Sequence, residues 1–91
     1  MKETVNAMND KLALKVKVEP GMFSHERFVT ISTKKGDFYL YVDASSLVGD
    51  LLRVFPVYQV DDEILIDLPQ ETLTTGSRIR VPRELLIPLP A

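Results

Sequence analysis

A two-residue alternation of apolar and other side chains runs through several segments of this chain. In the clearest segment, residues 12–18, leucine and valine alternate with alanine and lysine. The same rhythm returns over residues 38–42 and, in part, over residues 64–68. Successive side chains of a β-strand point to opposite faces, so this alternation indicates strands with one buried side and one solvent-facing side. The chain is therefore predicted to be mainly β.

A chain of 91 residues has room for one hydrophobic core. Residues 1–11 are polar and are expected to form a flexible N-terminal tail, with residues 12–91 forming a single β-rich domain. The chain has no cysteine, which excludes disulfides and thiolate ligands and favours a cytoplasmic location for so small a domain. No apolar run approaches the roughly 20 residues that a membrane helix requires, so we expect no membrane partner.

Turn signals divide the chain into short strands. Strands are expected over residues 12–19, 27–33, 37–42, 57–60, 63–68 and 78–81. Gly36 supplies the positive φ that a tight hairpin needs, so the strands on either side of it are predicted to pair antiparallel. Asp61 and Asp62 predict a second tight turn, because aspartate tolerates the left-handed region. Pro69 is expected to end its strand.

The stretch from Asp43 to Phe55 breaks the alternation, and two interpretations are open. Its apolar residues fall on one face of a helix, with Pro56 to stop it, which favours a helix over residues 44–55. Gly49 would cost such a helix roughly 1 kcal/mol relative to alanine. The second interpretation is a short helical turn over residues 44–48, followed by a strand from Leu51 to Val60.

These elements predict a small SH3-like barrel or two-sheet sandwich of five to six short antiparallel strands, with one short helix or helical turn. The alternative is an α+β fold with a helix at 44–55 packed on an antiparallel sheet. Two fragments resemble SH3-like barrels. They are the charged turn at residues 34–37 before an alternating strand, and the strand, proline and helical turn of residues 80–86. The resemblance implies a fold and no ligand, because the chain lacks the tryptophan of the SH3 peptide-binding platform.

No motif in the sequence requires catalysis, a metal or a cofactor. His25 is the single histidine, and its neighbours in sequence do not make a catalytic triad. Residues 61–63 are three consecutive acids without the alternate spacing of a calcium loop. Residues 74–77 read as a turn and lack the frame of a phosphate-binding loop. We therefore expect a protein that is not an enzyme and binds no cofactor.

Apolar residues near the C-terminus favour a binding or interaction module that acts through protein–protein contacts. A domain this small has limited interior for them, and exposed apolar patches mark interfaces. The expected partner is another protein or a second copy of the chain in a homodimer. The residues expected at this interface are Leu85, Leu86, Ile87 and Leu89.

The alternative function is that of a nucleic-acid-binding regulatory protein. If the alternating apolar residues point inward, the lysines, arginines and tyrosines between them point outward. Single-stranded nucleic acids stack their bases on such rings while cations follow the phosphates. Against this, the formal net charge is −2. The residues of this alternative site are Lys15, Lys17, Tyr39, Tyr41, Arg78 and Arg80.

Overall fold

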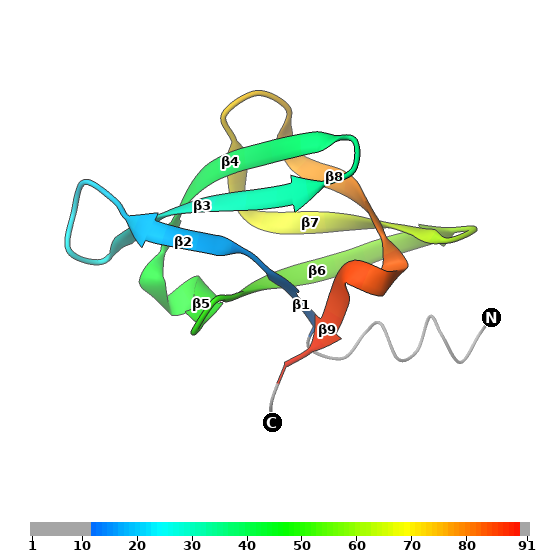
Figure 1. The fold of residues 1–91 in the computed structure, drawn as a ribbon, viewed down its shortest axis with the longest axis horizontal. Coiled ribbons are helices and arrows are strands. Elements are labelled where there is room, and N and C mark those ends of the chain that lie inside the picture. Colours follow the sequence, from blue (N-terminus) through cyan, green and yellow to red (C-terminus); the bar gives the residue numbers. More distant parts are fainter. Residues whose placement is uncertain (1–11, 90–91) are drawn as a thin grey trace.

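A computed structural model of the protein describes residues 12–89, so the tail predicted at residues 1–11 lies outside the described part. Nine strands and two 3₁₀ turns make up these residues (Figure 1). In chain order the elements are β1 (Leu12–Lys15), β2 (Lys17–Pro20), β3 (Glu26–Thr33), β4 (Gly36–Asp43), η1 (Ala44–Ser46), β5 (Leu47–Val48), β6 (Leu51–Val60), β7 (Glu63–Thr72), β8 (Gly76–Pro82), η2 (Arg83–Leu85) and β9 (Leu86–Pro88).

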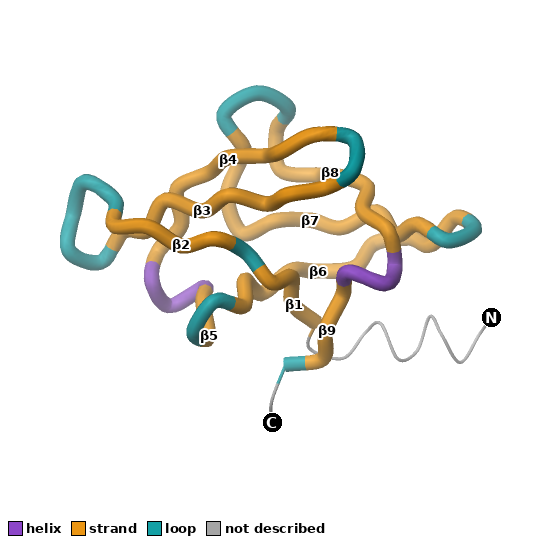
Figure 2. The backbone as a smooth tube through the Cα atoms, viewed as in Figure 1, coloured by secondary structure: helices purple, strands orange, loops and turns teal. Residues whose placement is uncertain are grey.

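The strands form two antiparallel sheets that face each other across the core (Figure 2). One sheet has three strands in the order β2-β3-β4. The other has six, in the order β8-β7-β6-β1-β9, with β5 paired to β6. The prediction of a mainly β fold is confirmed, in the form of a two-sheet arrangement that does not close into a barrel. Strands are more numerous than expected for two reasons. The very short strands β5 and β9 were not predicted, and one predicted strand is divided into two.

That divided strand is the alternating segment that begins at Leu12. Its first half, β1, pairs with β6 and β9 in the six-stranded sheet, whereas β2 pairs with β3 in the other sheet. Val16 lies between the halves, where its N–H donates to the carbonyl oxygen of Asp50 at 2.9 Å, and its side chain remains buried. The alternation continues through the corner because both sheets face one core, so sequence periodicity does not reveal the change of sheet.

The helix over residues 44–55 is wrong, and the turn followed by a strand is confirmed. Residues 44–46 form η1, and β6 begins at Leu51. Between them Gly49 has a φ of 63°, in the left-handed region, and turns β5 back onto β6. Glycine adopts that conformation without steric cost, which accounts for the local preference for a hairpin.

The two predicted hairpins are also confirmed. Thr33 pairs with Gly36 across the β3–β4 turn, and Val60 pairs with Glu63 across the β6–β7 turn. Asp61 occupies the left-handed region in the second turn, with a φ of 55°. The expected end at Pro69 is wrong: β7 continues to Thr72, and its register with β8 shifts after Asp67. A proline is tolerated there because the ladder is interrupted around it.

Inward-facing residues of both sheets form one apolar core. Fully buried members come from β1, β3, β4, β6, β7 and β8 and include Leu14, Val29, Leu40, Leu52 and Ile66. Burial at roughly 25 cal/mol per Å² of apolar surface makes this core the main stabilising contribution. Each sheet therefore packs one face against the core and has a second face directed outward. Within residues 12–89, no helix is long and apolar enough to cross a lipid bilayer.

Candidate functional site

The outer face of the three-stranded sheet carries an ordered grid of side chains. In β3, Val29 and Ile31 point into the core, so the residues that alternate with them point to the outside. The strand register places Phe28 between Glu19 and Tyr41 in one row. The next row has Thr30 between Lys17 and Tyr39.

Three aromatic rings gather on this face. The Phe28 ring lies 5.0 Å from that of Tyr41 in a tilted arrangement, and 6.0 Å from that of Tyr39 in a nearly parallel one, measured between ring centroids. Both tyrosines are about two-fifths exposed, at 40% for Tyr39 and 39% for Tyr41. We call Phe28, Tyr39 and Tyr41 the aromatic face. Aromatic pairs at these distances stabilise a sheet by roughly 0.5–1.5 kcal/mol beyond their buried area, yet the rings here remain open to solvent.

Negative charges outnumber positive charges around the aromatic face. Lys17 is the one basic residue that the register places on the outer face of β2, β3 and β4. The acidic residues on that face are Glu19, Glu26, Asp37 and Asp43. Arg27, next to Glu26 in β3, turns its guanidinium back to donate to the carbonyl oxygens of Ser24 and Glu26. The face is consequently anionic.

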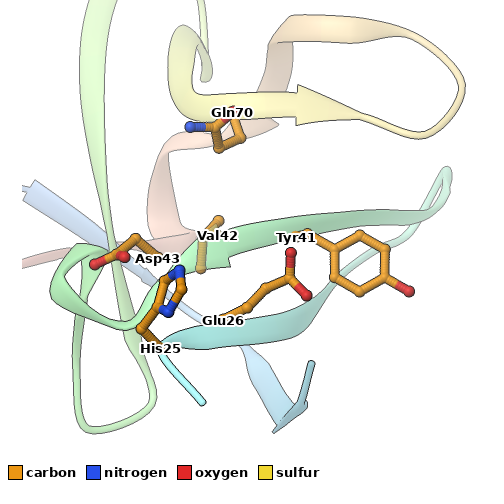
Figure 3. Close-up of a pocket in the computed structure, with 6 residues that line it drawn as sticks. All are labelled: His25, Glu26, Tyr41, Val42, Asp43 and Gln70. Carbon is orange, nitrogen blue, oxygen red and sulfur yellow. The ribbon is translucent and has the colours of Figure 1, made fainter. Parts of the chain in front are cut away.

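A cleft of about 290 Å³ lies at one end of the aromatic face. Its lining comes from the loop before β3, from the paired ends of β3 and β4, and from β7 of the other sheet (Figure 3). Figure 3 shows the Glu26 carboxylate between the side chains of His25 and Tyr41, with Gln70 on the opposite side. The remaining lining residues are Val42 and Asp43. Tyr41 belongs both to the cleft and to the aromatic face, so the two are continuous.

Local hydrogen bonds fix the two carboxylates of the cleft. Glu26 Oε1 accepts the backbone N–H of Met22 at 2.8 Å, and Asp43 Oδ2 accepts that of Ser45 at 2.9 Å, where Asp43 caps η1. Hydrogen bonds from Ser45, its hydroxyl first and its backbone N–H second, hold the pKa of Asp43 below its ordinary value. The positive charges of His25 and Arg27 act in the same direction. Asp43 is therefore ionised at neutral pH.

The loop between β2 and β3 extends the apolar surface beyond the cleft. Met22 is 80% exposed and Phe23 is 62% exposed, and the Phe23 ring stacks on the His25 imidazole at 6.2 Å. This loop projects from one end of the molecule in Figure 1. Large apolar side chains at such exposure contribute little to the core. Phe23 contacts His25, which lines the cleft.

The structure does not bring the six residues of the predicted nucleic-acid site together, although all six are exposed. Lys17, Tyr39 and Tyr41 share the outer face of the three-stranded sheet. Lys15 lies in β1 of the six-stranded sheet, with its Nζ 4.0 Å from Asp50 Oδ2. Arg78 and Arg80 lie in β8 of that sheet.

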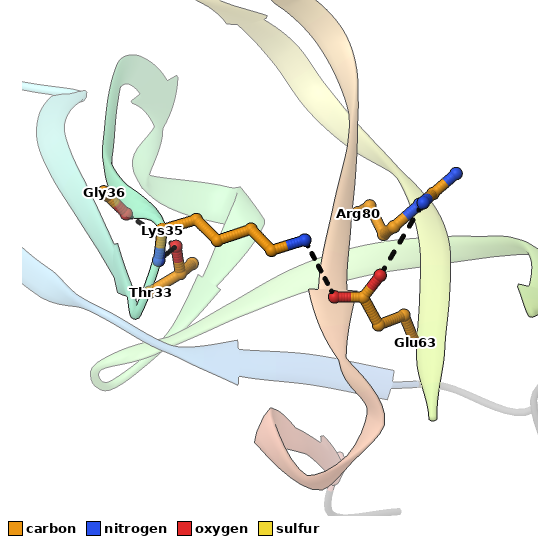
Figure 4. A network of polar contacts seen from close by, with 5 residues as sticks. All are labelled: Thr33, Lys35, Gly36, Glu63 and Arg80. Carbon is orange, nitrogen blue, oxygen red and sulfur yellow. Dashed lines mark hydrogen bonds and ion pairs between the residues drawn. The ribbon is translucent and has the colours of Figure 1, made fainter. Parts of the chain in front are cut away.

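Both arginines of β8 are paired with acids of β7. Arg78 donates to both carboxylate oxygens of Asp67, at 2.7 and 3.1 Å. Arg80 lies 3.7 Å from Glu63 Oε1, while Lys35 from the β3–β4 hairpin lies 3.4 Å from Glu63 Oε2 (Figure 4). Glu63, at the start of β7, thus links the six-stranded sheet to the β3–β4 hairpin of the other sheet. Exposed pairs of this kind contribute little individually, and they neutralise the cations that the nucleic-acid alternative invoked.

The residues of the predicted C-terminal interface are all partly buried. Leu85 and Leu86 pack against the core, and Leu86 pairs with Leu14 across β9 and β1. Ile87 pairs with Ala13 on the opposite side of that strand pair. Leu89 is also half-buried. Much of this apolar segment is therefore packed within the fold, against the core and β1.

Sequence reasoning did not identify Phe28, Glu26, Asp43 or Gln70 as site residues. Phe28 had a signal, since it alternates with Val29 and Ile31 within the predicted second strand. The two acids lie opposite each other in the β3–β4 register. Gln70 joins them because β4 passes close to β7, a contact marked by the hydrogen bond from Leu73 N–H to the Tyr39 carbonyl oxygen at 2.8 Å. No local pattern predicts that approach.

A second exposed apolar group lies on β6, away from the aromatic face. Its members are Phe55, Val57, Tyr58 and Val60, each more than two-fifths exposed. Arg53 covers the Phe55 ring, with its guanidinium carbon 5.5 Å from the centroid. In residues 12–89 no three histidine or acidic side chains converge closely enough to hold a metal ion.

Comparisons with protein-family models, with curated proteins and with solved structures find no match for this chain.

Proposed function

We propose that the protein is a small, non-enzymatic interaction module whose aromatic face binds a segment of a partner protein. The observation that carries the proposal is the gathering of Phe28, Tyr39 and Tyr41 on the solvent side of a sheet whose other side is already committed to the core. Tyrosine and phenylalanine are enriched at protein interfaces, because their rigid rings bury much area at little entropic cost.

The charge around the rings favours a protein over a nucleic acid. Nucleic acids gain affinity by replacing counterions with lysine and arginine, and this face offers Lys17 among four carboxylates. Stacking of bases on Tyr39 and Tyr41 is the one feature that favours the nucleic-acid alternative. We keep that alternative, and a second copy of this chain, as outcomes of the test.

The test selects a phage library of random linear peptides on the immobilised protein. Enriched peptides are then measured against the Tyr39→Ser/Tyr41→Ser variant. The matched control is Phe55→Ser/Tyr58→Ser, which removes two exposed rings from the other sheet. We expect binding to be lost in the first variant and retained in the second, because only the first removes the aromatic face. Far-ultraviolet circular dichroism confirms that each variant is folded.

Two further measurements separate the other occupants. Fluorescence anisotropy with oligothymidine and with single-stranded RNA, at low and high salt, tests binding of nucleic acid. Binding that weakens with added salt and in the Lys17→Ala variant would support the nucleic-acid alternative instead. Sedimentation velocity over a range of concentrations tests self-association through Tyr39 and Tyr41. If enriched peptides bind the Tyr39→Ser/Tyr41→Ser variant as well as the unaltered protein, the proposal is wrong.

A further inference from the structure

We infer that the partner segment is basic, and that the cleft beside Tyr41 receives one of its arginine or lysine side chains. This inference rests on the proposed function and adds the chemistry of the ligand. It follows from the charge of the cleft, from the absence of an ion pair to its carboxylates within residues 12–89, and from the tyrosine and glutamine that also line it.

Acids on the two sheets have different surroundings. On the six-stranded sheet, Glu63 and Asp67 each lie within 4 Å of an arginine or a lysine. Across residues 12–89, no ion pair of that length involves Glu19, Glu26 or Asp43 on the three-stranded sheet. The two acids of β7 are therefore paired within the fold, whereas the acids of the three-stranded sheet have no ion pair of that length. His25 and Arg27 lie close enough to act on Asp43, but a direct ion pair for Glu26 or Asp43 has to come from outside the described residues.

The Glu26 carboxylate is the group best placed to meet an incoming cation. One of its oxygens accepts the Met22 N–H, and Figure 3 shows the group between His25 and Tyr41, which also line the cleft. Asp43, opposite Glu26 in the strand register, adds a second negative charge at the same end of the sheet. A carboxylate that already accepts one hydrogen bond retains lone pairs for a charge-assisted bond to a guanidinium or ammonium group.

Tyr41 and Gln70 supply the other features of a cation site. Tyr41 lines the cleft and its ring lies beside the Glu26 carboxylate in Figure 3, and aromatic faces attract guanidinium groups. Gln70 also lines the cleft, on the other side of β4 from Tyr41 in Figure 3, and its side chain carries a carbonyl oxygen as a further acceptor. A planar fork of donors matches this combination better than a point charge, so arginine is expected to bind more tightly than lysine.

The geometry also predicts the spacing of the partner motif. Asp43 and Tyr41 are two residues apart on one strand face, about 7 Å, and so are Tyr41 and Tyr39. An extended peptide has the same repeat. If a basic side chain of such a peptide occupies the cleft, the residue two positions away lies over Phe28 and Tyr41. An apolar or aromatic side chain there buries the most apolar surface against the rings.

The test uses the peptides selected on the intact protein. We expect them to carry arginine or lysine with an aromatic or apolar residue two positions away. Calorimetric titration then compares the unaltered protein with Glu26→Gln, which keeps the acceptor oxygen for Met22 and removes the charge. We expect Glu26→Gln to weaken binding about tenfold to a hundredfold. Asp62→Asn, which removes one charge from the hairpin at the other end of the molecule, is the matched control and should bind as before (Figure 1).

A peptide in which the basic residue is replaced by glutamine completes a double-mutant cycle. If the cleft receives that residue, Glu26→Gln has little effect on the altered peptide, because the interaction is already absent. Equal losses for both peptides would overturn the inference. Selected peptides that need Tyr39 and Tyr41 but carry no basic residue would also overturn it, while leaving the proposed function standing. Failure to select peptides that depend on those tyrosines would overturn both the inference and the proposed function.

Discussion

Gly21 lies against Glu26 so closely that a Cβ at Gly21 would stand 2.8 Å from Glu26 Cγ and 2.9 Å from the Glu26 carbonyl carbon. Its N–H donates to the Glu26 carbonyl oxygen at 3.0 Å, closing the loop between β2 and β3. A Cβ contact under 3 Å forces displacement, and here one of the atoms met is backbone. The absence of a side chain at Gly21 is thus what lets the loop hold Glu26 at the cleft.

Gly21→Ala is expected to lower the free energy of unfolding by about 1–3 kcal/mol, because the added methyl group must push the loop away from β3. It is also expected to weaken binding of the selected peptides, since Glu26 moves with the loop. Urea unfolding and calorimetric titration measure the two effects. Ser24→Ala, a substitution of an exposed residue in the same loop, should change stability by no more than about 0.5 kcal/mol. Equal stability of the two variants would show that the loop accommodates the methyl group.

Alternation along the chain predicted most of the longer strands and the inward residues within them. It works at Leu12–Val18 and at Phe38–Val42 because each strand has one buried face, whichever sheet it joins. Glycine and aspartate at the turns located both hairpins for a related reason, since few residues adopt a positive φ at low cost. Both signals depend only on residues close together in the chain, so they can be recognised in a single sequence.

Contacts between strands distant in sequence could not be predicted in the same way. The corner at Val16 leaves the alternation intact, and the approach of β4 to β7 depends on how the two sheets pack. The predicted cationic face failed to assemble for this reason: Lys17 and Arg78 belong to different sheets. The sequence predicted two members of the aromatic face, Tyr39 and Tyr41. Placing Phe28 between them required the register of β3 and β4.

The pair between Asp67 and Arg78 predicts a specific dependence of stability on pH. The hydrogen bond from Arg78, together with its positive charge, lowers the pKa of Asp67 below 3.8 in the folded state. The folded protein therefore binds this proton less readily than the unfolded chain does. Stability from Asp67 is fully present above the ordinary pKa and is lost as the pH falls through the lowered folded-state value.

Asp67→Asn should accordingly be less stable than the unaltered protein at neutral pH, and the difference should shrink as the medium is acidified below about pH 4. Urea unfolding across that range measures it. In an Arg78→Gln background the same substitution should show a smaller pH-dependent difference, because the partner that lowers the pKa is gone. A difference that stays constant down to strongly acidic pH would show that the pair does not act through ionisation of Asp67.

Gln59 combines a buried acceptor with an accessible donor, and this predicts a stabilising substitution. It pairs with the buried residue Ile64, so its side chain points inward after the irregularity in β6 between Pro56 and Tyr58. Its Oε1 is buried and has no hydrogen-bond partner within the described residues, while its Nε2 donates to the Asp61 carbonyl oxygen at 3.1 Å. A buried acceptor without a partner costs roughly 1–3 kcal/mol.

Gln59→Met removes that acceptor and keeps a flexible side chain of similar length. The hydrogen bond that is lost lies at an exposed turn, where water replaces the Gln59 amide on the Asp61 carbonyl. We therefore expect the free energy of unfolding to rise by about 1 kcal/mol, measured by urea unfolding at an unchanged denaturant slope. Gln59→Glu should do the opposite, because it places a negative charge on the buried oxygen. Loss of stability in both variants would mean that Gln59 Oε1 is satisfied in solution, by an ordered water or by a shift of the hairpin.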